Sequence, residues 1–250
     1  MFSRPMKRSP KIHAAGSTDK GRVRFHNEDA FLILDDYHVY VVADGVGGLE
    51  GGEVASSKVI EMIAEEVETL ETGNAELTHA VLNQMVTYAV RRANSWIREE
   101  ARERQIRAMG TTIVLFMIDP QDHSKAECLH AGDSRVYRLR NKQIELITAD
   151  HSLATQMNVE EHSLPAQMQG VITRAIGIKT DVELESTPMD LKKGDRILVC
   201  SDGLNRMLTD GEIESLLAKG PLKDRPNHMV RSANLAGGYD NITCVVVDIG

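Results

Sequence analysis

The sequence predicts an α+β fold, a layered α-β-β-α sandwich in which two mainly antiparallel sheets are flanked by helices. Strand-like runs occur in blocks, and the two longest helical patterns stand together between two blocks. Strict alternation of strands and helices would indicate a parallel, doubly wound sheet, whereas segregated helices indicate separate layers. With 250 residues, 42% of them hydrophobic, the chain is long enough to bury the core of such a sandwich.

The first strands form a predicted β-hairpin. Residues 31–34 and 38–43 are short runs rich in β-branched and aromatic side chains, and Asp35-Asp36 stand between them as a turn. The second run ends with the letters VVAD, so that apolar residues continue up to Asp44. We therefore expect a buried strand that ends on a carboxylate.

Two long amphipathic helices are expected next, over residues 53–70 and 76–104. In each, apolar residues recur three or four positions apart, which places them on one face of a helix. The first pattern consists of Val59, Ile60, Ile63, Val67 and Leu70, and the second of Leu77, Val81, Met85, Tyr88, Trp96 and Ile97. Each helix therefore has one face to bury against a sheet.

The second half of the chain returns to strands and then to shorter helices. Strands are expected at 111–118, 125–130, 134–140, 143–148, 196–200 and 241–249, and helices at 210–219 and 225–236. Gly237-Gly238 end the last helix. Residues 150–172 fit neither period and contain Pro165. A loop of this length is usually functional or mobile, so we expect a flap over a site.

Composition sets the expected domain organisation and location. The first eleven residues are basic, which predicts a flexible tail over residues 1–12, and residues 13–250 are expected to form a single domain. No apolar run approaches the roughly 18–20 residues that span a bilayer, and the N-terminus lacks an apolar signal segment. We therefore expect a cytoplasmic monomer that does not bind membranes.

Charge and cysteine content exclude further classes of function. The formal net charge of −8 argues against nucleic acid as a partner, because phosphate backbones are bound by basic faces. Cys128, Cys200 and Cys244 lie in or beside apolar runs without CxxC spacing. We expect buried thiols in preference to a disulfide or a zinc site.

Acidic residues recur at the ends of the predicted strands. Asp44 and Asp202 each follow a buried strand and precede a glycine. The remaining acidic residues at such positions are Glu28, Asp29, Asp133 and Asp240. Carboxylates crowded at the edge of a core repel one another and need a compensating cation. Oxygen ligands without histidine or thiolate favour Mg²⁺, Mn²⁺ or Ca²⁺.

At this level two interpretations of the acidic residues stay open. Each Asp-Gly pair could be an ordinary turn. Taken together, the pairs could instead form a two-metal oxygen site, and such sites usually serve phosphoryl chemistry.

Eight motifs between residues 24 and 247 resemble those of the metal-dependent serine/threonine protein phosphatases, the protein phosphatase 2C family. Their order and spacing match as well, and the compact length resembles the short bacterial members. The motifs are RFHNEDA (24–30), VVADGVGGLEGGEVAS (41–56), MGTTIVL (109–115), HAGDSRVYRL (130–139), TADHSL (148–153), ITRAIG (172–177), ILVCSDGL (197–204) and GGYDNITCVVV (237–247).

The resemblance implies a role for each acidic residue that matches a family motif. Asp44 would bridge two metal ions, and Gly45 would bind one of them through its backbone carbonyl. Asp202 and Asp240 would supply the remaining carboxylate ligands of the first metal.

Five further residues receive roles from the same resemblance. Glu28 and Asp29 would hold metal ions or their waters, and Asp133 would bind a third, weaker metal. Arg24 would bind the substrate phosphate, for which the planar fork of guanidinium donors is suited. Asn241 is expected to support the ligands from outside the metal coordination.

The implied reaction is hydrolysis of phosphoserine and phosphothreonine in proteins, reversing a serine/threonine kinase. A hydroxide bridging two of the two or three Mn²⁺ or Mg²⁺ ions would attack phosphorus directly, without a covalent phosphoenzyme. The chain departs from many eukaryotic relatives at Val46, where those have a histidine thought to protonate the leaving alcohol. The general acid is therefore left unassigned.

Two other functions are weighed against this one. A pseudophosphatase that only binds phosphoproteins would have lost metal ligands, whereas all the carboxylates are present here. A two-metal nuclease would need a basic track for the nucleic-acid backbone. Serines and histidines near the motifs are expected to have structural roles; they are Ser134, Ser152, Ser201, His26, His130 and His151.

Overall fold

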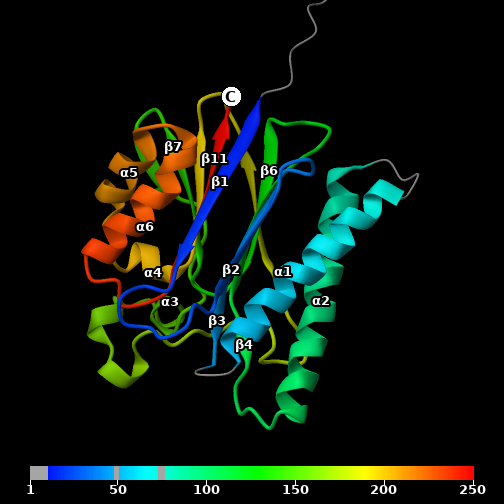
Figure 1. The fold of residues 1–250 in the computed structure, drawn as a ribbon, viewed down its shortest axis with the longest axis vertical. Helices are drawn as coiled ribbons and strands as arrows, with labels where there is room; N and C mark the ends of the chain where they lie inside the picture. The colour runs from blue at the N-terminus through cyan, green and yellow to red at the C-terminus, as the bar shows by residue number, and fades with distance from the viewer. Residues whose placement is uncertain (1–10, 48–50, 73–76) are drawn as a thin grey trace, which may run out of the picture.

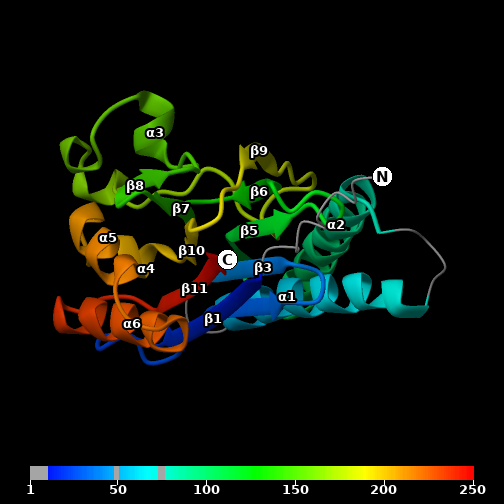
Figure 2. The ribbon, with the colours of Figure 1, turned by 90° about the horizontal axis from the view of Figure 1, so that it is seen from above.

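Two antiparallel sheets are stacked face to face at the centre of the molecule, and helices cover their outer faces (Figures 1 and 2). This computed structural model describes residues 11–47, 51–72 and 77–250. The first sheet has the strand order β1-β11-β10-β7-β8, and the second has the order β2-β3-β5-β6-β9, with the short β4 paired to β3. The predicted α+β sandwich is thus confirmed.

The strands have the following bounds. The first sheet consists of β1 (Ile12–Asp19), β7 (Arg135–Arg140), β8 (Gln143–Leu146), β10 (Arg196–Cys200) and β11 (Ile242–Ile249). The second consists of β2 (Asp29–Leu34), β3 (Val39–Val46), β4 (Gly110–Thr111), β5 (Ile113–Ile118), β6 (Lys125–Ala131) and β9 (Glu185–Asp190).

The helices form two groups. On the second sheet lie α1 (Gly52–Glu68), its 3-10 extension at Thr69–Thr72, and α2 (His79–Glu103). On the first sheet lie α4 (Asp202–Asn205), α5 (Asp210–Ala218), the 3-10 turn Leu222–Asp224 and α6 (Arg225–Leu235). The region between β8 and β9 holds α3 (Leu153–Met157) and 3-10 turns at Glu161–Ser163 and Ala166–Met168.

Strand β3 shows why the sequence stacks the sheets in this way. All of its first five residues are buried, and successive side chains of a strand point to opposite faces. Tyr40 and Val42 belong to the core between the two sheets, where the Tyr40 ring stacks on Phe116. Val39 and Val41 belong to the core under the helices. A strand buried on both faces requires the uninterrupted apolar run seen in the sequence.

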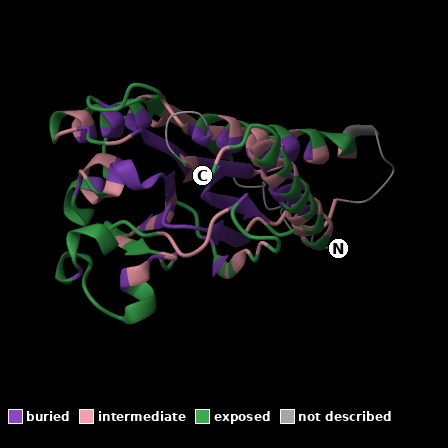
Figure 3. Ribbon diagram, turned by 90° about the horizontal axis from the view of Figure 1, so that it is seen from below, coloured by how far each residue is buried: buried purple, intermediate pink, exposed green. Residues whose placement is uncertain are grey.

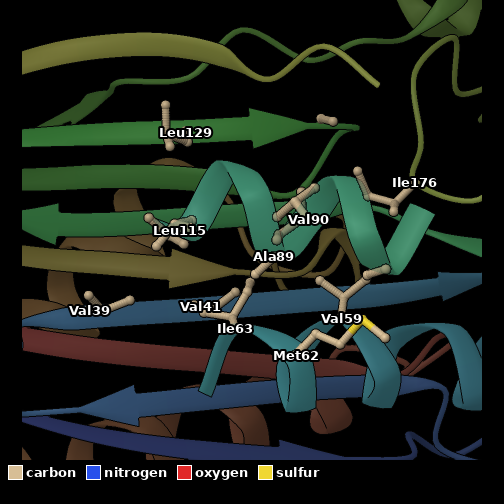
Figure 4. Close-up of a cluster of buried hydrophobic side chains, with 14 of the residues drawn as sticks. Val39, Val41, Val59, Met62, Ile63, Ala89, Val90, Leu115, Leu129 and Ile176 are labelled. Atoms are coloured by element: carbon tan, nitrogen blue, oxygen red, sulfur yellow. The ribbon is translucent and has the colours of Figure 1, made fainter. Parts of the chain in front are cut away.

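The core beneath α1 and α2 fixes both helices on the second sheet (Figure 4). Val59 and Ile63 of α1, together with Val90 of α2, are fully buried there. They face Val41 and Leu115 of the sheet, as the close-up shows. The helical periodicity in the sequence thus corresponds to the buried faces of these helices.

Two edge strands were not predicted. Strand β1 contains a glycine and small polar residues, and β9 contains Pro188, which is tolerated at a sheet edge because its missing N–H is not needed there. The expected tail lies largely outside the described residues, but Ile12 already belongs to β1 and is buried. The expected irregular region 150–172 contains α3 and two short 3-10 turns.

Burial follows the layers, with buried residues along the strands and exposed ones on the outer helix faces (Figure 3). Among the described residues, no helix is both long enough and apolar enough to cross a bilayer. The three cysteines are free and buried, as the sequence predicted.

Candidate metal centre

The acidic residues singled out in the sequence converge on one side of the molecule. Asp29 on β2 lies directly opposite Asp44 on β3 in the register of the hairpin. Asp202 begins α4 immediately after β10, Asp240 precedes β11, and Asp133 lies in the link between β6 and β7. The ends of these strands lie together near α3 and α4 (Figure 1). The two stacked sheets therefore position carboxylates from both layers in one place.

Asp44 lies at the centre of this acidic cluster. Burial raises the pKa of its carboxyl well above the usual range, and the charges of Asp29, Asp202, Asp133 and Asp240 raise it further, in that order. Four carboxylates can act on a fifth in this way only if they lie close to it. The cluster thus favours either protonation of Asp44 or binding of a cation beside it.

Hydrogen bonds hold Asp29 in a fixed position opposite Asp44 in the hairpin. The Ser201 hydroxyl donates to Asp29 Oδ2 at 2.8 Å and accepts from the Thr243 N–H at 3.0 Å. Burial raises the pKa of Asp29 to about 7, against the lowering effect of its bonds to Thr243 and Ser201. Ser201 is therefore fully engaged in orienting a carboxylate.

A guanidinium that sequence reasoning did not single out lies between the next two carboxylates. Arg206, at the end of α4, is 2.8 Å from Asp202 Oδ2 and 3.4 Å from Asp133 Oδ2 through the same Nη2 atom. Burial raises the pKa of Asp133 to about 7, and the charge of Asp202 raises it further, whereas Arg206 opposes the shift. Arg206 thus places a positive charge between two of the buried carboxylates and partly offsets their repulsion.

Arg24 pairs with the outermost carboxylate of the cluster. Its Nη2 lies 2.7 Å from Asp240 Oδ2, and its side chain is half exposed. The guanidinium therefore lies at the boundary between the buried acidic residues and solvent, where a substrate can reach it.

Glycines allow the backbone to pack closely around Glu28. A Cβ at Gly45 would lie 2.4 Å from the carbonyl carbon of Gly52, and a Cβ at Gly52 would lie 2.4 Å from Glu28 Oε2. The Glu28 carbonyl accepts from the Gly45 N–H and from the Ser56 hydroxyl. Burial raises the pKa of the Glu28 carboxyl, and the nearby Arg24 lowers it. Side chains larger than hydrogen at either glycine would push Glu28 out of the cluster.

Asn241 fixes the loop that carries Arg24 and Glu28. Its side-chain oxygen accepts from the Glu28 N–H, and its side-chain amide donates to the carbonyls of Lys20 and His26, all at 2.8 Å. One amide side chain thus holds both ends of this loop beside Asp240. A role for Asn241 in supporting metal ligands stays a prediction.

The donor set fits divalent cations. Within the described part of the chain, Asp29 Oδ1, Asp133 Oδ1 and Asp202 Oδ1 are buried and accept no hydrogen bond. Buried polar atoms almost always have a partner, so three orphaned carboxylate oxygens in one cluster require an explanation. Hard cations such as Mg²⁺ and Mn²⁺, which are bound by oxygen atoms, provide it.

Comparison with known proteins supports the same conclusion. The sequence profile of the family described as protein phosphatase 2C matches residues 20–234. The chain belongs to the protein phosphatase 2C family. The serine/threonine phosphatase stp of Listeria welshimeri is 31% identical over 255 residues, which cover 95% of this chain and 96% of the relative. The chain is thus a serine/threonine protein phosphatase.

Solved structures of the same family share the fold. PppA, described as a key regulatory component of the T6SS in Pseudomonas aeruginosa, superposes with a TM-score of 0.85 at 31% identity, covering 96% of this chain and 98% of PppA. The catalytic domain of the serine/threonine phosphatase PstP, in complex with two manganese ions, superposes with a TM-score of 0.80 at 30% identity, covering 95% of this chain and 98% of that domain.

A cavity of about 440 Å³ connects the acidic cluster of this phosphatase to residues 150–172. Asp133, Asp202 and Arg206 line one side of it, and Glu161 and Gly170 line another. The region that fits no simple period in the sequence thus lies beside the carboxylates.

A second group of possible metal ligands has a structural explanation. His130, His151 and Glu185 bring three ligand atoms within 4.8 Å of one another. The two imidazole rings stack almost parallel, 4.4 Å between centroids, so their in-plane lone pairs do not converge on one point. His151 also accepts from the Gly132 N–H through Nδ1 and binds Glu185 through Nε2. These contacts fix the loops behind the phosphatase site.

Replacing Arg206 by glutamine is expected to destabilise the phosphatase in the presence of a chelator. The variant removes a cation paired with two buried carboxylates, although the guanidinium itself is 44% exposed. We expect a loss of about 1 kcal/mol, the upper end for exposed pairs, and a decrease in melting temperature of about 2–4 °C. Thermal unfolding at pH 7.5 in the chelator measures this decrease in melting temperature. Arg206→Lys keeps the charge and should recover part of the loss; equal melting temperatures for Arg206→Gln and wild type would contradict this role.

Proposed function

We propose that this phosphatase hydrolyses phosphoserine and phosphothreonine in proteins with divalent cations held by Asp44, Gly45, Asp202 and Asp240. Glu28, Asp29 and Asp133 complete the oxygen ligands in this proposal. The observation that carries it is the cluster of buried carboxylates with orphaned oxygens immediately beside a half-exposed arginine. Two or three Mn²⁺ or Mg²⁺ ions held there would lower the pKa of a water, so that hydroxide is available near neutral pH.

Arg24 is proposed to bind and orient the phosphate. A guanidinium presents two parallel N–H donors to two phosphate oxygens, which fixes the direction of the scissile bond. The Asp240 contact at 2.7 Å holds this donor fork at the mouth of the cluster. The Asn241 bonds to Lys20 before Arg24, and to His26 and Glu28 after it, keep that loop in position.

Among the described residues, the three serines near the motifs are engaged in hydrogen bonds. Ser201 donates to Asp29 and accepts from the Thr243 N–H. Ser134 shares a hydrogen bond with the Thr112 hydroxyl at 2.8 Å, and Ser152 accepts from the Thr155 N–H as the N-cap of α3. These bonds support direct attack by water on phosphorus instead of a covalent phosphoserine intermediate.

Val46 cannot donate a proton to the departing serine or threonine alkoxide, so another group has to supply it. It pairs with Gly110 between β3 and β4 and has no titratable atom. General acid catalysis is typically worth about 10²–10⁴ in rate, so a better leaving group should compensate for its absence.

The proposed substrates are phosphoproteins made by a serine/threonine kinase that this phosphatase opposes. The family membership and the names of the relatives support this class of substrate. The test is hydrolysis of phosphothreonine peptides and of DNA, each with manganese and with a chelator. Phosphate release from the peptides in manganese alone is expected. Peptide binding without phosphate release would indicate a pseudophosphatase, and cleavage of DNA would indicate a nuclease.

Replacing Arg24 by alanine is expected to raise KM for a phosphopeptide by about 10–100-fold, because a hydrogen bond to a charged group is worth about 1.5–3 kcal/mol. Metal affinity measured by calorimetry should change little, since Arg24 contacts the phosphate in this proposal. Arg22→Ala is the matched control, because Arg22 donates to the Asn234 carbonyl instead. A large loss of manganese binding in Arg24→Ala would show that the arginine only supports the cluster.

A further inference from the structure

The most exposed large hydrophobic side chains of the described residues lie on two short segments beside the acidic cluster. Phe25 is 84% exposed, Leu235 71%, Tyr239 65% and Val23 56%. Each of the other exposed large hydrophobics in the described ranges is less exposed than these four. Scattered exposed apolar residues are ordinary, whereas a group of them at one place indicates a binding surface.

The two segments are joined to each other by hydrogen bonds. The Arg22 N–H donates to the Gly238 carbonyl at 2.8 Å, and Arg22 Nη1 donates to the Asn234 carbonyl. A few residues further along, Arg24 pairs with Asp240. The loop after β1 and the segment from the last residue of α6 to the start of β11 therefore run side by side (Figure 1). Val23, Phe25, Leu235 and Tyr239, here called the apolar rim, lie on this joined pair.

The apolar rim is continuous with the site proposed for the phosphate. Val23 and Phe25 are the immediate chain neighbours of Arg24, and Tyr239 is the immediate neighbour of Asp240. A phosphate held by Arg24 therefore places the residues next to the phosphoresidue within reach of the rim. Residues 150–172, the expected flap, lie on the opposite side of α4 (Figure 2), so the apolar rim is separate from them.

We propose that the apolar rim binds the phosphoprotein chain beside the phosphoresidue and selects substrates with a large apolar side chain next to it. This inference rests on the phosphoprotein phosphatase activity proposed above. Covering exposed apolar side chains with an apolar side chain of the substrate removes both from water. Aromatic side chains such as Phe25 and Tyr239 bind in this way at low entropic cost, because each has only two side-chain torsions.

The test compares two phosphothreonine peptides of equal length, one with leucine and one with glycine on both sides of the phosphothreonine. For the wild type in manganese we expect kcat/KM to be about tenfold higher for the leucine peptide, which corresponds to about 1.4 kcal/mol. In a Phe25→Ser/Tyr239→Ser double variant the ratio should fall close to one. Both positions are exposed, so folding is preserved, and circular dichroism checks this.

Tyr88→Ser provides a matched control, because it removes a 53% exposed aromatic side chain from α2. This variant should keep the tenfold ratio. Equal rates of the wild type on both peptides would overturn the inference while leaving the proposed function intact. A ratio that persists in the double variant would assign the preference to the flap, where Met157 and Val171 are also exposed, and would overturn it too.

Two further outcomes separate the remaining explanations. Hydrolysis of neither peptide in manganese would overturn the proposed function and this inference with it. Sedimentation of the wild type and the double variant tests whether a second copy of the chain covers the rim. A dimer that the double variant abolishes would assign the rim to self-association and contradict substrate binding.

Discussion

Asparagine in place of Asp44 or Asp202 is expected to lower kcat/KM for a phosphopeptide by about 10³-fold or more. Asparagine keeps the size of the side chain and removes one negative charge from the proposed cation site. A catalytic metal ion stabilises the transition state by several kcal/mol, and each 1.36 kcal/mol is a factor of about ten in rate. Phosphate release at saturating manganese measures the loss of activity, and calorimetry measures the loss of metal affinity.

The control for this experiment tests whether the loss of activity depends on where the negative charge is removed. Asp36→Asn removes one negative charge from the exposed hairpin turn, far from the cluster, and should retain wild-type activity. If Asp44→Asn or Asp202→Asn kept near-normal turnover while correctly folded, the ligand assignment would be wrong.

Asp44→Asn is also expected to stabilise the protein in a chelator. Asp44 is half-buried and lies within the fields of four other carboxylates, so it destabilises the folded state when it is ionised and no cation is present. Asp44→Asn removes this repulsion. A variant with lower activity and a higher melting temperature without metal is the pattern expected of a functional site that is strained without its cation.

Much of the fold was predictable because local patterns decide it. The hairpin that carries Asp29 and Asp44 was predictable from two β-branched runs and a turn, and α1 and α2 from their period. Edge strands β1 and β9 were missed, since both are only partly buried and their sequences lack an apolar run. Their positions depend on pairing with β11 and β6, which lie far along the chain.

The site was predictable in its acidic residues and less so in the residues that organise them. Glycine after Asp44 and after Asp202 was a visible signal, but the hydrogen bonds of Asn241 to Lys20 and His26 depend on contacts between the two ends of the chain. Arg206 had a local signal, since it stands four residues after Asp202, the spacing at which side chains meet on a helix. Its second contact, to Asp133, depends on how two distant loops meet in the tertiary structure.

In a chelator, the phosphatase is expected to be less stable at pH 8 than at pH 6.5. The pKa values of Asp29 and Asp133 are raised to about 7 in the folded protein, from an ordinary value of 3.8, mainly by burial. Between these values the folded state holds more protons than the unfolded state, so stability falls as the pH rises toward and through 7. For two such groups the difference is about 1–2 kcal/mol, which is several degrees in melting temperature.

Histidines set the lowest pH at which the stability of the protein should be compared. A variant separates the contribution of the carboxylates. Burial lowers the pKa values of His38 and His151, so these residues destabilise the folded state at more acidic pH, and measurements should stay at or above pH 6.5.

Asp133→Asn removes one of the two titrating carboxyls and should reduce the dependence of stability on pH by about half. Manganese at pH 8 should raise the melting temperature, and at pH 6.5 its binding should release protons, because the cation replaces protons on the same oxygens. A metal-free protein equally stable at both pH values would show that these carboxylates are not crowded in solution, and the cation site would lose its physical basis.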